Sequence, residues 1–228
     1  LIFGEDEPID AYVIKVKDVK EYHRIFAEIN KDKRKQCSGE ETFLHKYLAG
    51  DSEAIKTATA LFAAGLTICG SPDDPKKGYV GNPTDPLVTV SGFRRAVKRE
   101  SLKNQQTVPN VKMAADTIKS AWTKDNKVQT ELLEGLVILF QTYPVLASTR
   151  KGNKIAPEFR NWFSSIISHW PQKEMAKRWK VTGGNVHHFA SESTARGILK
   201  DFNSMTTAGG ASSKKKTLSV NKLDALFT

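Results

Sequence analysis

The sequence has little cysteine and no long apolar run. It contains only two cysteines, Cys37 and Cys69, in 228 residues, which is too few for a disulfide framework and favours a reducing compartment. No stretch approaches the roughly 20 consecutive apolar residues of a transmembrane helix, so we expect no membrane span. Hydrophobic residues nevertheless make up 39% of the chain and include four tryptophans, which indicates a folded protein.

Motifs that would indicate an enzyme are also missing. The sequence has no G-x-x-x-x-G-K loop and no G-x-G-x-x-G loop for a nucleotide. The adjacent His187 and His188 would point about 100° apart on a helix, and no H-E-x-x-H or C-x-x-C spacing for a metal exists. Cys37 has no recognisable base to activate it as a nucleophile. We therefore expect a protein that is not an enzyme and that binds neither a cofactor nor a metal.

Most segments have apolar residues at helical spacing, which predicts a mainly α fold. Ser38 and Glu41 have the spacing of a capping box. Residues 70–86 gather turn residues and predict a loop or short hairpin, and strand signals are confined to residues 10–17 and 86–90. Helices are expected over residues 18–30, 40–48, 53–68, 91–100, 108–122, 131–140, 156–170 and 185–205.

Positive charge is concentrated in the central part of the chain. The net charge is +10, and residues 94–180 hold 17 Lys and Arg against 7 Asp and Glu, whereas residues 1–93 hold 12 against 15. An even distribution would be typical of a solvated surface. The observed concentration indicates a binding surface for a polyanion.

The segment SGFRRAVKRE, residues 91–100, carries four of these cations on one short predicted helix. Arg94 and Lys98 are four residues apart, and so are Arg95 and Arg99, so each pair destabilises a helix by about 0.2–0.5 kcal/mol. Only one acidic residue within the segment, Glu100, offsets them. We therefore expect these four side chains to contact phosphates.

Aromatic residues alternate with the cations of the central part, as in proteins that bind single-stranded nucleic acid through phosphate contacts and base stacking. The alternative for the rings is ordinary core packing, because tryptophan at helical spacing is commonly buried. The residues predicted to contact RNA are Arg94, Arg95, Lys98, Arg99, Lys103, Lys124, Lys127, Arg150, Lys151, Lys154, Arg160, Lys177, Arg178, Lys180, Tyr143 and Trp179.

The two ends of the chain differ from its middle. An apolar tip precedes the acidic GEDEP, and TTAGGASSKKK predicts a flexible linker before a short apolar helix. Because a helix this short is not stable alone in water, it needs a groove on its own domain or on a neighbouring molecule, and both remain open. The residues predicted to mediate oligomerisation are Leu1, Ile2, Phe3, Val220, Leu223, Leu226 and Phe227.

These patterns predict two helical lobes that flank a basic groove, with extended terminal arms. The predicted parts are an N-terminal arm (1–17), an N-terminal lobe (18–106), a C-terminal lobe (107–208) and a linker with a C-terminal arm (209–228). A protein that coats RNA fits them best. The alternatives are a matrix-type protein that binds anionic membrane and a nuclease whose carboxylates meet only in the folded state.

Residues 81–100, GNPTDPLVTVSGFRRAVKRE, resemble the middle of nucleoproteins from segmented negative-strand RNA viruses of the bunyavirus group, which includes orthobunyaviruses and tospoviruses. There, a G-N…N-P turn leads into an L-T…S-G-[FY]…A-R segment. Residues 140–147, FQTYPVLA, are similar to a later F-x-F-Y-P-L-A run, and the closing LDALFT looks like an apolar C-terminal hook. The residues that match the first segment are Gly81, Asn82, Pro83, Leu87, Thr89, Ser91, Gly92 and Phe93.

The resemblance implies a nucleoprotein that forms a viral nucleocapsid. Its fold would be two helical lobes with an RNA groove between them, and its terminal arms would dock on adjacent protomers. It would coat genomic RNA without sequence preference in the virion and the host-cell cytoplasm. The implied partners are single-stranded RNA, further copies of the same chain and a viral polymerase.

Overall fold

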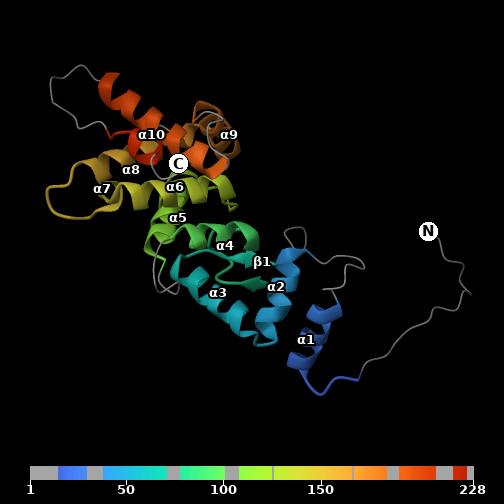
Figure 1. Cartoon of the computed structure of the whole chain (residues 1–228). Coiled ribbons are helices and arrows are strands. Elements are labelled where there is room, and N and C mark those ends of the chain that lie inside the picture. Colours follow the sequence, from blue (N-terminus) through green and yellow to red (C-terminus); the bar gives the residue numbers. More distant parts are fainter. Residues whose placement is uncertain are drawn as a thin grey trace, which may run out of the picture.

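The computed structural model describes residues 15–29, 38–70, 78–100, 108–124, 126–165, 167–183, 190–208 and 218–224. Within these residues the protein is mainly helical, as predicted, with a single two-stranded sheet (Figure 1). The described elements are α1 (Val19–Ile29), α2 (Gly39–Leu48), α3 (Ser52–Ala63), β1 (Ile68–Cys69), β2 (Tyr79–Val80), α4 (Val90–Arg99), α5 (Pro109–Ala121), α6 (Thr130–Thr142), α7 (Pro144–Ala147), α8 (Ile155–Ser165), a 3-10 helix (Ile167–His169), α9 (Gln172–Gly183), α10 (Ala190–Ala208) and α11 (Asn221–Asp224).

A side chain caps the first turn of α2 and of α3. The Ser38 hydroxyl accepts a hydrogen bond from the backbone N–H of Glu41 at 3.1 Å, which confirms the predicted start of α2, because such a cap satisfies a free N–H of the first turn. Residues 53–68 were expected to form one helix, and this was wrong at the C-terminal end. Helix α3 ends at Ala63, and Gly65 then adopts a positive φ of 65° that leads into β1.

Residues 70–86 were predicted to form a loop or short hairpin, and their described part, 78–86, contains β2 and no helix. Strand β2 pairs antiparallel with β1, which lies just before this segment, with Ile68 opposite Val80. The expected strand over 86–90 does not form. Instead, Leu87 makes isolated parallel bridges with Thr67 and Lys127, and α4 begins directly afterwards. Of the expected strand over 10–17, only residues 15–17 are described, and they form none.

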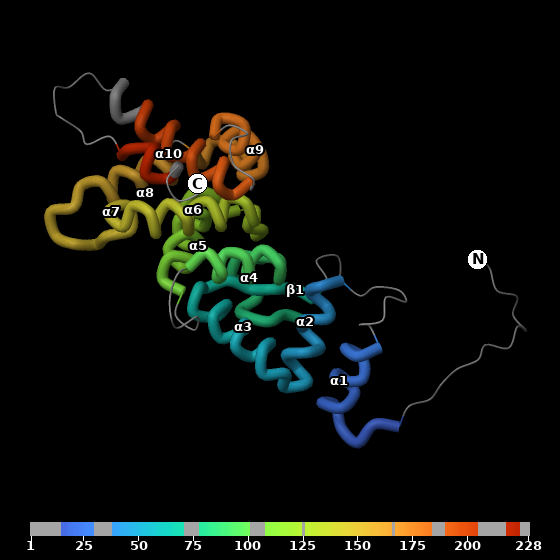
Figure 2. The backbone as a smooth tube through the Cα atoms, viewed as in Figure 1, coloured from blue at the N-terminus to red at the C-terminus, as the bar shows by residue number. Residues whose placement is uncertain are grey.

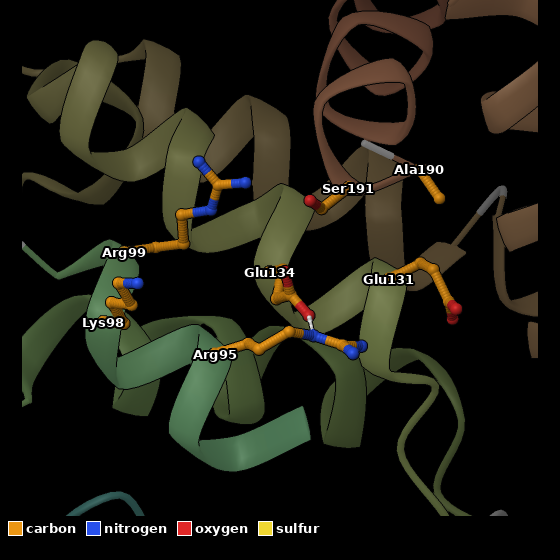
Figure 3. A pocket seen from close by; sticks show the side chains of 7 residues that line it. All are labelled: Arg95, Lys98, Arg99, Glu131, Glu134, Ala190 and Ser191. Atoms are coloured by element: carbon orange, nitrogen blue, oxygen red, sulfur yellow. Dashed lines mark hydrogen bonds and ion pairs between the residues drawn. The ribbon is translucent and has the colours of Figure 1, made fainter. Parts of the chain in front are cut away.

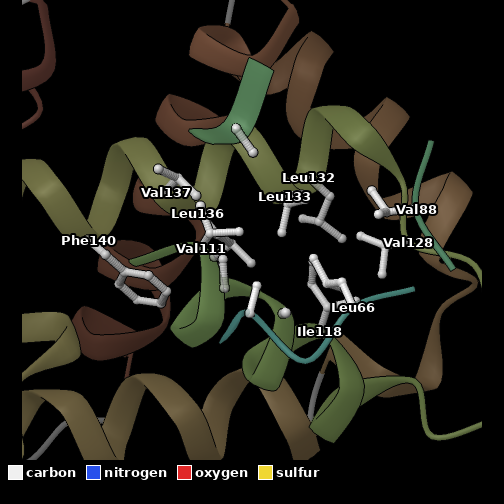
Figure 4. Close-up of a cluster of buried hydrophobic side chains, with 14 of the residues drawn as sticks. Leu66, Val88, Val111, Ile118, Val128, Leu132, Leu133, Leu136, Val137 and Phe140 are labelled. Atoms are coloured by element: carbon white, nitrogen blue, oxygen red, sulfur yellow. The ribbon is translucent and has the colours of Figure 1, made fainter. Parts of the chain in front are cut away.

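The core centres on α6, whose residues from Leu132 to Phe140 are all buried. Figure 4 shows these side chains packing with Val111 and Ile118 of α5 and with Leu66. Burying one such large apolar side chain stabilises the fold by about 1.5–3 kcal/mol. The continuous apolar composition of this segment predicted that it crosses the core, and the structure confirms it.

One buried hydrophobic cluster joins both predicted lobes. It extends along the sequence from Phe43 to Leu223 and includes Phe93 of α4 together with Phe159 and Trp179. The lobes defined at residues 106 and 107 therefore share a core, and the boundary between them stays a prediction.

Helix α10 packs closely on both α9 and α6. A Cβ atom at Gly197 would overlap the backbone of Trp179, and one at Gly183 would overlap the backbone of Ser193. On the other side, Gly135 of α6 lies against the backbone of α10. These glycines let the helix axes approach, because no side chain separates them. The contacts fix the beginning of α10 beside α6, where the candidate site lies.

Candidate nucleic-acid interface

A pocket of about 610 Å³ lies where α4, α6 and α10 meet (Figure 3). Helix α4 belongs to the predicted N-terminal lobe, whereas α6 and α10 belong to the predicted C-terminal lobe. The pocket is lined by Arg95, Lys98 and Arg99 of α4, Glu131 and Glu134 of α6, and Ala190 and Ser191 of α10. We call it the α4–α6–α10 pocket.

The sequence of α4 explains why it presents cations to this pocket. Its Thr89 cap accepts from the backbone N–H of Gly92 at 3.1 Å, and Phe93 and Ala96 on its inner face are fully buried. Gly92 also lies so close to the side chain of Thr130 that a Cβ atom there would collide with it. This close packing on the first turn of α6 leaves the next helical face, with its Arg and Lys residues, beside the pocket.

Two of the four cations of α4 are paired with buried carboxylates. Arg95 Nε donates to Glu134 Oε1 at 2.7 Å; the Arg95 side chain is 57% exposed and that of Glu134 is 5% exposed. Arg99 Nη2 lies 3.1 Å from Glu192 Oε1 of α10, which is also buried. The expectation that only Glu100 offsets these cations was therefore wrong. A sequence signal exists for Glu134, which is a single Glu within the apolar segment LLEGLVILF, but not for Glu192, whose neighbours are polar.

Glu100 was expected to offset the cations of α4, but its carboxylate instead binds the beginning of α5. Its carboxylate accepts hydrogen bonds from the backbone N–H groups of Asn110 and Val111, both at 2.9 Å. These are N–H groups of the first turn of α5, which have no partner inside the helix. Glu100 thus caps α5 across a gap of ten residues in the sequence.

The two remaining cations of α4 point in different directions. Arg94 lies over the ring of Phe43 in α2, with 5.8 Å from its Cζ atom to the ring centroid, and it does not line the pocket. Lys98 lines the pocket and is exposed, and it forms no ion pair with a described residue. Of the four predicted phosphate contacts on this helix, three therefore lie at the pocket.

The other predicted RNA contacts do not gather at this pocket. Arg150, Lys151 and Lys154 are exposed in the loop between α7 and α8, which Figures 1 and 2 show at the left edge of the view, beyond α7. Lys124 and Lys127 are exposed between α5 and α6, and Lys103 lies outside the described residues. The pocket therefore gathers only part of the predicted set, and a wider surface that includes the other cations stays a prediction.

The cations of α8 and α9 lie on a further part of the surface. Lys177, Arg178 and Lys180 are exposed on α9, and Arg178 Nε lies 3.5 Å from Asp201 Oδ2. Arg160 is half-buried and its Nε donates to the carbonyl of Ala156, one turn earlier in α8, at 3.4 Å. The basic residues of α9 are thus exposed, but their spacing in the sequence did not predict which helices would face one another.

Both rings predicted to stack on bases are buried. Trp179 is fully buried, and its Nε1 donates to Asp201 Oδ2 at 2.9 Å. Tyr143 is 5% exposed, its hydroxyl donates to the carbonyl of Ser219, and Lys222 lies over its ring at 5.7 Å. Neither ring face is available to a base, so this prediction was wrong for both residues. Their helical spacing reflected core packing, which was the alternative interpretation.

The C-terminal segment docks on its own chain. Leu223 is fully buried, and Val220 packs against the core. Asn203 of α10 donates from Nδ2 to the carbonyl of Leu218 at 2.8 Å and accepts from its N–H at 3.3 Å. Val220 and Leu223 thus pack in a groove of the same molecule. The other residues predicted to mediate oligomerisation lie outside the described residues: Leu1, Ile2, Phe3, Leu226 and Phe227.

The described part of the chain shows neither a cluster of metal ligands nor a membrane-spanning helix. No group of three or more His, Cys, Asp or Glu side chains is placed there to hold a metal ion. None of its helices combines the length and the apolar character required to cross a membrane. The adjacent His187 and His188 lie outside the described residues.

Comparisons with known proteins add no relative. No protein-family model, no curated protein and no solved structure matches this chain. The resemblance of residues 81–100 to bunyavirus-group nucleoproteins therefore stays a prediction from those residues.

Proposed function

We propose that the protein is a nucleoprotein that binds single-stranded RNA without sequence preference and coats it. The observation that carries this proposal is the α4–α6–α10 pocket, where Arg95, Lys98 and Arg99 line one cavity at the beginning of α10. The net charge of +10 and its concentration in residues 94–180 support a polyanionic ligand. Contacts to phosphates carry no sequence information, which fits a coating protein.

The contact between Arg95 and Glu134 prepares the guanidinium for a phosphate. A guanidinium has five N–H donors, and the bond to Glu134 uses the Nε–H. The terminal NH₂ groups remain for a phosphate, and the exposed fraction of the side chain leaves them accessible to solvent. Because a buried carboxylate holds the Arg95 side chain in place, less side-chain entropy is lost when RNA binds.

Lys98 supplies the second contact in this proposal. Its ammonium is exposed beside the pocket and has no acidic partner among the described residues. Glu131 lies on the opposite wall and weakens the attraction for a phosphate. A bound strand therefore also requires exposed cations outside the pocket, such as Lys124 and Lys127 in the loop before α6.

Self-assembly is the second part of the proposal. The groove that holds Leu218 and Leu223 in the same molecule can hold the equivalent segment of another molecule, because the contacts with Asn203 and the core would be identical. Deleting the chain from Leu218 onward should reduce the size of the assembly measured by light scattering. An unchanged oligomer would show that this segment does not mediate assembly. As a viral nucleoprotein, the protein would act in the virion and host-cell cytoplasm beside a viral polymerase.

A pair of charge reversals tests the proposed pocket. Lys98→Glu places a negative charge at the pocket, and Lys20→Glu makes the same change at an exposed position on α1. We expect Lys98→Glu to weaken binding of single-stranded RNA and to reduce the slope of log K against log salt by about 0.7 for each phosphate that the variant no longer neutralises. Lys20→Glu should leave that slope unchanged. Equal effects of the two variants would contradict the assignment of the pocket.

A further inference from the structure

Trp170 differs from the other three tryptophans in its exposure. Trp122, Trp162 and Trp179 are at most 7% exposed, whereas Trp170 is 53% exposed. Its ring makes no ring contact with another described aromatic residue. Leaving so large an apolar surface in water is costly, and tryptophan is enriched where a protein binds a partner.

The backbone that carries this ring is firmly held. The N–H of Trp170 donates to the carbonyl of Ile167 at 3.0 Å, and its carbonyl accepts from Trp122 Nε1 at 2.6 Å. Pro171 follows and restricts the backbone further, and α9 begins at the next residue. The exposed ring therefore extends from a fixed base, which lowers the entropy lost when a ligand contacts it.

Three exposed lysines lie on the two segments that meet at Trp170. Lys124 and Lys127 belong to the loop between α5 and α6, and Lys173 belongs to the first turn of α9. This loop is joined to the Trp170 segment at both of its ends, by Trp122 Nε1 as described above and by the N–H of Gln129, which donates to Gln172 Oε1 at 2.6 Å.

The charge at this surface is positive among the described residues. None of the three lysines forms an ion pair with a described residue, and the acid next to Lys173, Glu174, is itself exposed. The combination of an exposed indole face and lysines without an ion pair to a described residue suits a ligand that has flat apolar rings joined by phosphates. A protein partner with an apolar patch would match the ring but not the lysines.

This surface and the pocket both include residues at the beginning of α6. Gln129 contacts the start of α9, and Glu131, two residues later, lines the α4–α6–α10 pocket. A strand whose phosphates occupy the pocket can therefore continue along the beginning of α6 to Trp170. We infer that Trp170 is a stacking site for an unpaired base of single-stranded RNA, with Lys124, Lys127 and Lys173 contacting the flanking phosphates. This inference rests on the proposed function.

The test uses the intrinsic fluorescence of the full chain. Trp170 is the exposed member of the four tryptophans, so a stacked base should quench its emission, while the buried rings stay unaffected. Oligouridylate is titrated into the wild type and into Trp170→Phe and Trp170→Ala, together with an abasic ribose–phosphate oligomer of the same length. Phe62→Ala, which removes another half-exposed ring on α3, is the matched control.

We expect oligouridylate to quench the wild type and to leave the emission of Trp170→Phe unchanged. Trp170→Ala should weaken oligouridylate binding roughly 5- to 150-fold, the range for removal of one base stack, and Trp170→Phe should retain most of the affinity. Binding of the abasic oligomer should be the same in wild type and Trp170→Ala, because only phosphates are contacted. Phe62→Ala should bind both oligomers like the wild type.

Several outcomes would overturn the inference while leaving the proposed function intact. In one, the wild type binds oligouridylate without quenching and Trp170→Ala binds it equally well. In another, Trp170→Ala weakens binding of the abasic oligomer as much as binding of oligouridylate, which would indicate a structural effect of the substitution. A blue shift of emission with anionic vesicles and none with RNA would identify a membrane contact and also overturn it. If the wild type binds neither oligomer, the proposed function itself fails.

Discussion

The ion pair between Arg95 and Glu134 leads to a prediction in which stability and RNA binding respond differently. Arg95→Gln removes the cation and leaves a buried carboxylate without its 2.7 Å partner. Glu134→Gln removes the negative charge but keeps an amide oxygen that can accept from Arg95 Nε. The double variant replaces the ion pair with two neutral amides, so no buried charge remains.

The magnitude follows from the exposure of the two side chains. Removing one partner of a fully buried pair costs about 3–5 kcal/mol, and an exposed pair contributes about 0–1 kcal/mol. Because Glu134 is 5% exposed and Arg95 is 57% exposed, we expect Arg95→Gln to lower the free energy of unfolding by about 1–3 kcal/mol, the penalty of an unsatisfied buried group. The double variant should recover at least half of that loss.

Urea unfolding and RNA binding of the four proteins measure the two effects. Arg95→Gln and the double variant should both bind RNA more weakly than the wild type, because both lack the guanidinium. Glu134→Gln should bind RNA more tightly, because it keeps the guanidinium and loses a negative charge. If the double variant binds RNA as well as the wild type, Arg95 does not contact phosphate. If it is as unstable as Arg95→Gln, the stranded carboxylate is not the cause of the instability.

Three further changes test other parts of the structure. Glu131→Gln removes an acid from the pocket wall and should tighten RNA binding in a fluorescence anisotropy titration; unchanged affinity would show that the strand does not pass this wall. Glu100→Ala removes both acceptors at the beginning of α5 and should lower the free energy of unfolding by about 1–2 kcal/mol, measured in urea. Gly197→Ala should push α10 away from the backbone of Trp179 and lower the urea concentration at the unfolding midpoint. An unchanged midpoint would contradict the close packing of the two helices.

Patterns that involve neighbouring residues were predictable from the sequence. The cap at Ser38 and the buried segment of α6 depend on residues that are close along the chain. In these segments local chemistry and periodicity were sufficient.

Contacts between distant residues were not predictable in the same way. The pairing of Arg99 with Glu192 joins positions 93 residues apart, and no local pattern distinguishes this carboxylate from a solvated one. The burial of Trp179 depends on how closely α9 approaches α10 at Gly183 and Gly197. The candidate site therefore required the structure, whereas the excess of positive charge that led to it is visible in the sequence.

The central claim is that this protein binds the phosphates of single-stranded RNA irrespective of sequence. The most direct measurement is the dissociation constant of the wild-type chain for labelled oligouridylate and for a mixed-sequence RNA of the same length, over a series of salt concentrations. We predict nearly equal constants for the two RNAs and a linear decrease of log K with log salt, with a slope of about −0.7 for each phosphate neutralised. Absence of binding at the lowest salt concentration, or affinity that does not depend on salt, would contradict the claim.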